Sequence, residues 1–441
     1  MNKPVLGVIG LGYIGQPTVA ALANVGYDVV GMDIDPIKIK NLKQNKATLY
    51  EPGLNETLQR IQNNCRFTND YKDLMNWCDA ILITVGTPLG KNNEPDFSAL
   101  DSVVKNIGKY IRHGQIIILR STVSPGTTEK VANDLAKLTK FKCGKDFFVS
   151  FCPERTIEGL ALHELYNLPK IIGGINPEST VKTAEILKRL GSKVVTTSSA
   201  TVAELCKLAD NMYRALNIAF ANEFGDICEL AKIDAYEVVN AVNSTYSRTN
   251  IFRPGLGAAG PCLSKDPTML SSFAENLGMT TELVNACISV NKNSNLKVIQ
   301  KTEDFLNLHE LDTARIAILG LAFKGKPETD DYRESPAATI HQELIKRNLA
   351  QFKRNINFTF YDPIIYKFFD NIVTKTLEDC IKDANVILFL NDHPKIMDIP
   401  LEHIIEYTDK PVLIIDAWHN VVKPEDKSLL DSVEFIQIGV G

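Results

Sequence analysis

The chain has 441 residues, of which 44% are hydrophobic and 23% are charged, and its formal net charge is -5. This length exceeds one ordinary hydrophobic core, so two or three soluble domains are expected. No basic block runs along the sequence, which argues against nucleic acid and anionic membrane surfaces as partners. No apolar run approaches membrane-spanning length and no export signal opens the chain, so we expect a cytoplasmic protein whose 9 cysteines are reduced thiols.

The first 200 residues alternate between short β-branched runs and helical stretches. This alternation predicts a doubly wound parallel sheet, because parallel strands are buried on both faces and are connected by helices. The expected buried strands are Val5–Ile9, Asp28–Met32, Ala80–Thr84, Gln115–Leu119, Phe147–Phe151 and Lys170–Ile172.

The middle of the chain is expected to be helical. Apolar residues recur at helical spacing from Thr201 to Ile233, and Gly225 is the first glycine or proline in that stretch, which predicts one long helix. Further helices are expected up to about Phe305. A second strand–helix alternation follows, with expected strands at Arg315–Leu319, Asn357–Tyr361, Val386–Leu390 and Val412–Ile415. The two α/β ends are similar in type without visible sequence repetition.

A glycine fingerprint follows the first expected strand. Gly10, Gly12 and Gly15 form G-x-G-x-x-G, whose glycines permit a tight turn, close approach of a pyrophosphate and close helix–strand packing. The N-terminus of the next helix supplies amide donors for phosphate. Asp33 ends the second expected strand, where a carboxylate accepts both ribose hydroxyls and repels a 2′-phosphate, so NAD is favoured over NADP. A ligand-free glycine turn is the alternative, but the ordered strand, loop, helix and acid favour the cofactor.

These patterns predict the fold class α/β, with two doubly wound Rossmann-like domains joined by a long central helix and a helical domain. The expected domains are an NAD-binding Rossmann domain at 1–200, a central helical domain at 201–305 and a C-terminal α/β domain at 306–441. The length and apolar stripe of the long helix predict that it forms a subunit interface.

Cys262 lies in a stretch rich in glycine and alanine, which reads G-L-G-A-A-G-P-C-L-S-K-D at 255–266. It is the only one of the 9 cysteines in a glycine-rich loop, where the backbone can approach a ligand closely. Lys265 and the positive end of a helix starting near Pro267 would favour the thiolate. Composition fits a small buried cysteine in a turn equally well, and Asp266 also fits the N-cap of that helix.

Other polar candidates share a helix face or a strand end. Lys207 and Asn211 are four residues apart on the long helix, so they lie on one face, although a solvated lysine is the alternative. Glu154 and Glu158 follow the fifth expected strand and Thr122 follows the fourth. The carboxyl ends of parallel strands form the ligand crevice of an α/β sheet. Surface loop residues are the alternative for these three.

Taken together, these segments resemble the UDP-glucose/UDP-mannosaminuronate dehydrogenase family. The resemblance runs through nearly the whole chain and rests on ordered motifs at family-like spacing. They are G-L-G-Y-I-G at 10–15, Y-E-P-G-L at 50–54, V-G-T-P at 85–88, S-T-V at 121–123, P-E-R-T-I-E-G at 153–159, E-L-C-K-L-A-D-N at 204–211, the stretch around Cys262, L-G-L-A-F-K at 319–324 and R-E-S-P at 333–336.

The resemblance implies residue roles and no metal. Cys262 would be the nucleophile, Asp266 would assist water activation, and Arg248 would reach the sugar nucleotide, in one arrangement across a dimer interface. The implied catalytic residues are Cys262, Lys207, Asn211, Asp266, Thr122 and Glu158. The implied NAD contacts are Gly10, Gly12, Tyr13, Ile14, Gly15, Asp33, Lys38, Thr87, Thr122 and Arg333. The implied substrate contacts are Glu154, Arg155, Lys207, Asn211, Arg248, Phe252, Gly257 and Lys324.

The chain departs from the family pattern at three places, one of which is Ser264 in place of a common proline. Ala259-Gly260-Pro261 precedes the cysteine where the family has two glycines and then serine or histidine, and a proline removes a backbone donor. The stretch from Lys324 to Arg333 is two residues longer than the family's usual spacing. Either Lys324 or Lys326 could therefore carry the family role.

The implied activity is NAD-dependent four-electron oxidation of the 6-hydroxyl of a UDP-hexose by a homodimer, supplying uronic acids for surface polysaccharides. A Cys262 thiohemiacetal and thioester would be its intermediates. P-E-R-T resembles the N-acetylhexosamine branch, which favours UDP-N-acetylmannosamine or UDP-N-acetylglucosamine, with UDP-glucose next. A two-electron relative of the hydroxyacid dehydrogenases and a catalytically silent NAD-binding protein are the alternatives, and the number of NADH formed per sugar separates the three.

Overall fold

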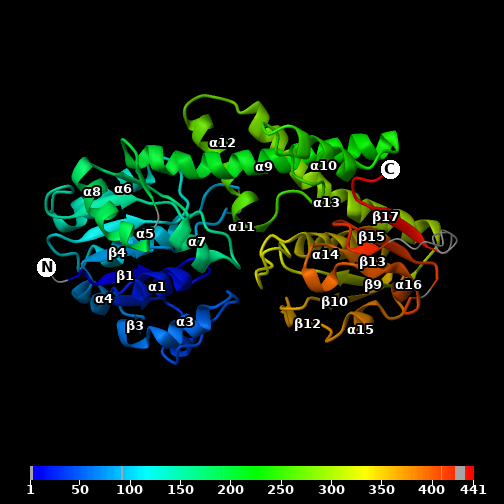
Figure 1. Ribbon diagram of the computed structural model, residues 1–441, viewed down its shortest axis with the longest axis horizontal. Helices are drawn as coiled ribbons and strands as arrows, with labels where there is room; N and C mark the ends of the chain where they lie inside the picture. The colour runs from blue at the N-terminus through cyan, green and yellow to red at the C-terminus, as the bar shows by residue number, and fades with distance from the viewer. Residues whose placement is uncertain (1–2, 91–92, 192, 409, 423–432) are drawn as a thin grey trace. The chain divides into compact units, whose positions relative to one another are not determined.

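The computed structural model describes residues 3–90, 93–191, 193–408, 410–422 and 433–441. The chain forms two compact units, each built on its own sheet (Figure 1). The first unit contains residues 1–210 and 268–279, and the second contains residues 211–267 and 280–441. The long helix α9 (Ala200–Ala231) begins in the first unit and ends in the second.

The first unit has an eight-stranded sheet of order β3-β2-β1-β4-β5-β6-β7-β8. Its strands are β1 (Leu6–Ile9), β2 (Val29–Met32), β3 (Cys65–Thr68), β4 (Ala80–Ile83), β5 (Ile116–Leu119), β6 (Phe148–Phe151), β7 (Lys170–Gly174) and β8 (Val194–Thr196). The six expected strands are confirmed to within two residues at each end. The additional strands, β3 and β8, lie at the two edges of the sheet. Both are partly exposed, so their sequences lack the continuous apolar run that marks a strand buried on both faces.

One pair of strands contradicts the predicted parallel sheet. β6 and β7 run antiparallel, with Ser150 opposite Gly174. The chain between them forms only the seven-residue helix α7 (Ala161–Asn167), which packs against α1 (Gly15–Asn24). The sequence pattern could not show this, because a buried strand has the same apolar run in either direction.

Helices cover this sheet and bury both of its faces. Besides α1 and α7 they are α2 (Pro36–Leu42), α3 (Leu54–Arg60), α4 (Tyr71–Trp77), α5 (Ser98–Ile107), α6 (Thr127–Thr139) and α8 (Pro177–Leu187). Along β4, Ala80 and Leu82 belong to one apolar core, and Ile81 and Ile83 belong to the other. The strand order reverses between β1 and β4, which is the switch point where doubly wound sheets bind ligands.

The second unit has a five-stranded sheet of order β10-β9-β13-β15-β17, whose strand pairs are parallel. Its strands are β9 (Thr313–Leu319), β10 (Asn355–Tyr361), β13 (Val386–Phe389), β15 (Leu413–Asp416) and β17 (Glu434–Gln437). Its helices include α10 (Ala235–Thr245), α13 (Glu282–Leu308), α14 (Pro336–Arg347), α15 (Leu377–Ile381) and α16 (Leu401–Ile405). The four expected strands are confirmed, β17 is additional, and the switch point lies between β9 and β13.

The predicted long helix is confirmed as α9, which is 32 residues long. Gly225 lies inside it, and a Cβ there would come within 2.8 Å of Pro254, so close packing explains this helical glycine. Cys262 lies in a short helix, α11 (Gly260–Leu263), so the predicted loop is wrong at the cysteine itself. Pro261 favours this turn, because a proline in the first positions of a helix is already set in the helical conformation.

His341 is the polar centre of an aromatic cluster in the second unit. It lies on α14, is buried, and packs edge-on against Phe358 and Phe360 of β10, with ring centroids 4.8 and 5.0 Å apart. Its Nδ1 has no hydrogen-bond partner in the part of the chain that the structure describes. Burial lowers the pKa of His341 below its ordinary value, because the imidazolium would lose its hydration.

We predict that this cluster loses stability as the pH falls. Below about pH 6.5 the unfolded chain takes up a proton at His341, whereas the folded chain does so only at lower pH. Between these two pKa values the unfolded state binds more protons, so the free energy of unfolding decreases with decreasing pH. Urea unfolding at about pH 7.5 and about pH 5.5 should show a smaller decrease for His341→Leu than for the wild type. Equal decreases in the two proteins would contradict the prediction.

Candidate active site

The predicted dinucleotide loop joins β1 to α1 and is pressed against the end of β4. Gly10 has a φ of +93°, and a Cβ there would lie 3.0 Å from the backbone of Thr84 and Val85. Thr84 Oγ1 donates to the Gly10 carbonyl oxygen at 2.6 Å. A Cβ at Gly15 would lie 1.9 Å from that oxygen, whereas a Cβ at Gly12 would meet no described atom within 4 Å. Packing therefore requires glycine at positions 10 and 15, and it leaves space beside Gly12 for a ligand.

Asp33 follows β2 and holds this loop through its carboxylate. Its oxygens accept hydrogen bonds from the amides of Leu11 at 2.8 Å and Asp35 at 3.0 Å, and from Lys38 Nζ at 2.9 Å. Burial alone would raise the pKa of Asp33, but the hydrogen bonds from the Asp35 amide and from Lys38 outweigh burial and lower the pKa. The group is therefore an anion near neutral pH, and it can accept hydrogen bonds from hydroxyls.

The other predicted NAD contacts divide between the two units. Tyr13 and Ile14 are half-buried where α1 begins. Thr87 Oγ1 donates to the Thr122 carbonyl oxygen at 2.6 Å, which ties the segment after β4 to the segment after β5. Arg333 belongs to the second unit, where its guanidinium makes two-pronged contacts with a neighbouring carboxylate.

A buried ion pair joins the ends of β5 and β6. Arg120 is 2% exposed and Glu154 is 8% exposed, and the Arg120 guanidinium contacts one carboxylate oxygen of Glu154. The other oxygen accepts hydrogen bonds from the amides of Arg155 at 2.8 Å and Thr156 at 2.9 Å. Burial alone would raise the pKa of Glu154, yet the charge of Arg120 outweighs it and lowers the pKa to about 2. Glu154 thus fixes the start of the segment that leads to Glu158, which is half-buried.

The sequence analysis did not identify Arg120 as a site residue, although a charged residue directly after an apolar strand could have indicated it.

Glu204, on α9, is a second buried residue that the sequence analysis did not identify. It is fully buried, and its oxygens accept hydrogen bonds from the Gly126 amide at 2.6 Å and from the amide and hydroxyl of Thr128 at 2.8 and 2.6 Å. Glu204 therefore fastens the start of α6 to the helix that carries Lys207, and that lysine is buried, not solvated.

In the second unit a wholly buried carboxylate lies four residues after the candidate nucleophile. Asp266 accepts a hydrogen bond from Asn211 Nδ2 at 2.5 Å on one oxygen, and Lys265 Nζ lies 2.7 Å from the other. Asp266 is the first residue of α12 (Asp266–Asn276), and both of its oxygens have side-chain partners. Lys265 balances this buried carboxylate, a role that the sequence did not indicate.

Cys262 is exposed, and the backbone beside it is fixed. The Gly260 amide donates to the Glu334 carbonyl oxygen at 3.0 Å, and a Cβ at Gly260 would lie 2.6 Å from the ring of Phe323. The missing donor of Pro261 costs nothing here, because the first amides of a helix have no partner within it.

The loop after β9 repeats the design of the dinucleotide loop. Gly320 has a φ of +81°, and the next amide, that of Leu321, donates to Asp362 at 2.8 Å. Lys324 is half-buried on this loop and donates to a neighbouring carbonyl oxygen. Lys326 is exposed, with its Nζ 2.9 Å from the sulfur of Met397. The sequence signal for this second loop was the short run G-L-x-x-x-G, which occurs in both places.

The remaining predicted substrate contacts lie before Cys262 or after β6. Arg248 is exposed, with its guanidinium 4.6 Å from the ring centre of Tyr246. Phe252 and Gly257 are half-buried in the segment that leads to α11. Arg155, in the first unit, pairs with a carboxylate of α9 at 3.0 Å.

Within the described residues, no group of three or more His, Cys, Asp or Glu side chains is arranged to hold a metal ion. None of the helices in the described ranges is both long and apolar enough to cross a membrane. None of the cysteines in the described residues forms a disulfide bond.

Family models match the chain in three consecutive parts. The NAD binding domain of the UDP-glucose/GDP-mannose dehydrogenase family matches residues 5–191, its central domain matches residues 201–293, and its UDP binding domain matches residues 317–424.

Relatives and solved structures agree with these matches over the full length. The UDP-N-acetyl-D-mannosamine dehydrogenase of Pyrococcus horikoshii is 32% identical over 99% of both chains. A solved structure of the UDP-N-acetyl-D-mannosamine dehydrogenase from that organism covers 99% of both chains with a TM-score of 0.88. The UDP-glucose dehydrogenase of Pyrobaculum islandicum is 26% identical, with a TM-score of 0.85 over 100% of this chain and 98% of its own. The chain therefore belongs to the UDP-glucose/GDP-mannose dehydrogenase family, whose members carry an NAD-binding and a UDP-binding domain.

Proposed function

We propose that the protein oxidises the 6-hydroxyl of UDP-N-acetyl-D-mannosamine to a carboxylate, with NAD as the oxidant. Its family makes it an NAD-dependent UDP-sugar dehydrogenase. The observation that carries the chemistry is the exposed thiol of Cys262, close in sequence to the buried Asp266 that is bonded to Asn211. The choice of sugar is supported by relatives of that name at 30–33% identity and by the P-E-R-T segment.

The reaction removes four electrons from one carbon, so it needs two hydride transfers. NAD, when bound, supplies the hydride acceptor for each of them. Gly10, Gly12 and Gly15 would hold its pyrophosphate, and Asp33 would accept the ribose hydroxyls. Tyr13, Ile14, Lys38, Thr87 and Arg333 complete the proposed NAD contacts.

Cys262 makes the second oxidation feasible. In the first oxidation the hydroxyl loses its proton and the 6-carbon loses a hydride, which gives an aldehyde. The thiolate then adds to the aldehyde carbon and a proton goes to the oxygen, which gives a thiohemiacetal whose carbon can again lose a hydride. Loss of that hydride and of the hydroxyl proton leaves a thioester. Water attacks the thioester, which releases the carboxylic acid and returns the thiol.

Other residues of the chain are proposed to handle the protons and the developing charge. Lys207 and Asn211 are proposed to stabilise the oxyanions that form at the 6-carbon. Asp266 is proposed to accept the proton of the attacking water, supported by its burial and by its hydrogen bond from Asn211. Thr122 and Glu158 are proposed to position water and to share the acid/base work.

The rest of the substrate requires contacts away from the thiol. We assign the sugar nucleotide to Glu154, Arg155, Arg248, Phe252, Gly257 and Lys324. Lys324 is preferred to Lys326, because it is half-buried on the loop at the switch point of the second sheet, whereas Lys326 is exposed.

We also propose that the protein is a homodimer that pairs through α9. Three large apolar side chains recur on this helix at seven-residue spacing, namely Tyr213, Phe220 and Ile227, and they are 65%, 52% and 58% exposed. Leu230 extends the stripe and is 88% exposed. Such a continuous apolar stripe is stable in water when a second surface covers it.

The first prediction of this proposal concerns stoichiometry and sugar. With UDP-N-acetyl-D-mannosamine the enzyme should form two NADH per molecule of acid, because both hydrides leave the same carbon. NADH absorbance and acid should be measured at completion, in parallel with UDP-N-acetylglucosamine and UDP-glucose. One NADH per sugar would exclude the four-electron reaction, and a clear preference for UDP-glucose would exclude the proposed sugar.

The second prediction concerns Cys262→Ser. Serine keeps the size and a polar atom but is almost never ionised near neutral pH, so acid formation should fall at least about 1,000-fold, or roughly 4 kcal/mol of barrier. NAD and the UDP-sugar should still bind, as titration calorimetry can check. Cys65→Ser is the control, because burial and Asp28 raise the pKa of Cys65 to about 12 and keep it a neutral thiol. Acid formation by Cys262→Ser near the parent rate would refute the covalent mechanism.

The third prediction concerns the dimer. Phe220→Asp combined with Ile227→Asp should convert the protein to a monomer, because two buried carboxylates would oppose their copies across the interface. Light scattering at the assay concentration measures the mass directly. Glu223→Gln, at an exposed position of the same helix, should stay dimeric. A wild-type protein that light scattering shows to be a monomer, and that is fully active at the same concentration, would contradict the dimer proposal.

A further inference from the structure

Four asparagines from three helices hold the backbone that leads to Cys262. They are Asn217 and Asn222 on α9, Asn243 on α10 and Asn291 on α13. Each one bonds its side-chain amide to backbone groups within residues 250–258, and all of these residues lie in the second unit. We call this set the asparagine frame. The backbone amides and carbonyls of an irregular segment are not paired with one another as they are in a helix or a sheet. The asparagine side chains that bond to them therefore fix the conformation of the segment.

The first half of the segment is held on two sides. Asn217 accepts a hydrogen bond from the Phe252 amide at 2.9 Å and donates to the Asn250 carbonyl oxygen at 2.6 Å. Asn243 accepts from the Ile251 amide at 2.9 Å and donates to the Ile251 carbonyl oxygen at 2.8 Å. Each of these two carboxamides therefore uses its donor and its acceptor at once.

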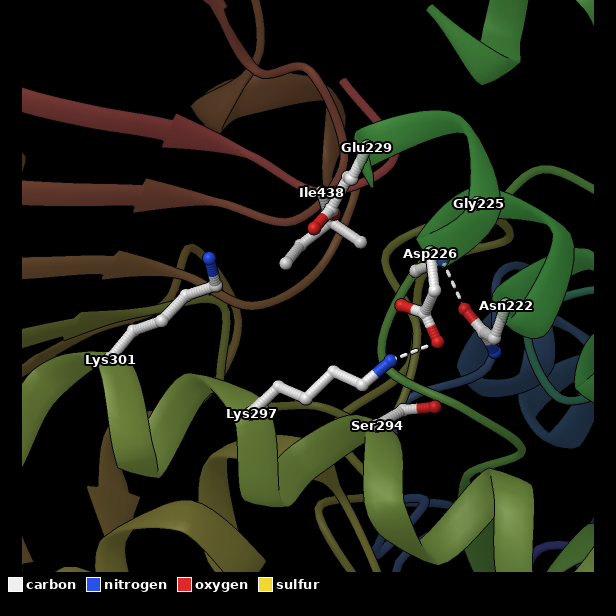
Figure 2. Close-up of a pocket in the computed structure, with 9 residues that line it drawn as sticks. Asn222, Gly225, Asp226, Glu229, Ser294, Lys297, Lys301 and Ile438 are labelled. Atoms are coloured by element: carbon white, nitrogen blue, oxygen red, sulfur yellow. Dashed lines mark hydrogen bonds and ion pairs between the residues drawn. The ribbon is translucent and has the colours of Figure 1, made fainter. Parts of the chain in front are cut away.

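The second half is held nearer to the cysteine. Asn222 accepts a hydrogen bond from the Gly255 amide at 2.7 Å. Figure 2 shows Asn222 beside the ion pair between Asp226 and Lys297, which joins α9 to α13 at this point. Two of the three helices that carry the frame, α9 and α13, are therefore tied to each other as well as to the segment.

Asn291 is the member that joins three elements. It is 9% exposed, accepts a hydrogen bond from the Ala258 amide at 3.0 Å, and donates to the Ala215 carbonyl oxygen of α9 at 3.1 Å. A Cβ at Gly257 would lie 2.4 Å from the Asn291 carbonyl oxygen, so the segment lies directly on α13 there. The next fixed point is the Gly260 amide, which is two residues further and belongs to the first residue of α11.

We propose that Asn291 is a positioning residue that sets the location and reactivity of the Cys262 thiol through the backbone of Ala258. This inference rests on the proposed function in taking Cys262 as the nucleophile. A thiol on a four-residue helix has little structure of its own, so its place depends on where the preceding backbone is fixed. A displacement of about 1 Å at a reacting group can cost on the order of 100-fold in rate.

The test compares Asn291→Asp and Asn291→Leu with two controls. Asparagine to aspartate keeps the acceptor for the Ala258 amide but removes the donor to Ala215, and leucine removes both. Asn293→Asp makes the same change at an exposed position of α13. Val298→Ala truncates a wholly buried side chain on that helix, so it lowers stability without removing any hydrogen bond of the asparagine frame.

Two measurements separate positioning from general weakening. The first is the rate at which iodoacetamide alkylates Cys262 as a function of pH, followed by peptide mass spectrometry without substrates. The second is kcat and KM for both substrates. Both Asn291 variants should change the alkylation profile and lower kcat at least about 10-fold, while KM for NAD stays within about twofold. Both controls should keep the wild-type profile and kcat below their melting temperatures.

The proposal is overturned if Asn291→Asp keeps the wild-type alkylation profile and kcat, or if Val298→Ala loses kcat to the same extent. Should the Asn291 variants not fold, Asn222→Leu removes one hydrogen bond from the Gly255 amide and carries the same test. The alkylation experiment uses no sugar, so it stands even if the wild type oxidises no UDP-sugar. In that case the proposed function fails while the positioning role is judged separately.

Discussion

Both α/β units depend on one interaction, the hydrogen bond from a loop amide to a carboxylate at the end of the neighbouring strand. Asp33 accepts from the Leu11 amide and Asp362 accepts from the Leu321 amide, each at 2.8 Å. A parallel sheet covered on both faces offers ligands only the ends of its strands, so this bond shapes the surface at each switch point. The units differ in what else the carboxylate binds. Asp362 accepts hydrogen bonds from further backbone amides, whereas Asp33 accepts one from the Asp35 amide and is also paired with the Lys38 side chain.

Buried carboxylates elsewhere in the chain differ in their partners, and the partner decides what each can do. Glu154 is paired with a buried guanidinium, and removing one member of such a pair typically costs about 3–5 kcal/mol. Glu204 has backbone amides and a hydroxyl as its hydrogen-bond donors, and burial raises its pKa. Asp266 accepts a hydrogen bond from an asparagine and is paired with a lysine. Glu154 therefore fits a fixed anchor, Glu204 fits a helix fastener, and Asp266 is held by polar side chains.

The surroundings of Cys262 combine an exposed side chain with a constrained backbone. The Cys262 side chain is exposed, so packing constrains it less than it constrains a buried side chain. The structure compensates by fixing the preceding backbone at Gly255, Ala258 and Gly260. Preorganisation of this kind lowers the entropy that a reaction must lose in its transition state.

Most of the architecture could be predicted from the sequence because it depends on local pattern. Continuous apolar runs marked the central strands, the glycine fingerprint with Asp33 marked the cofactor loop, and apolar spacing marked α9. Edge strands such as β3 were missed because they are partly exposed, and the antiparallel β6–β7 pair was missed because strand direction leaves no trace in composition.

The sequence by itself determined the family-like order of motifs, the NAD fingerprint and the identity of the candidate thiol. Only the tertiary structure decided which polar residues are partners. Arg120 and Glu154 are 34 residues apart, Glu204 and Thr128 are 76 apart, and Asn291 and Ala258 are 33 apart. No spacing rule predicts such pairs, since their contact depends on how strands and helices distant in sequence pack. Local periodicity therefore fixes the elements, and long-range packing fixes the site.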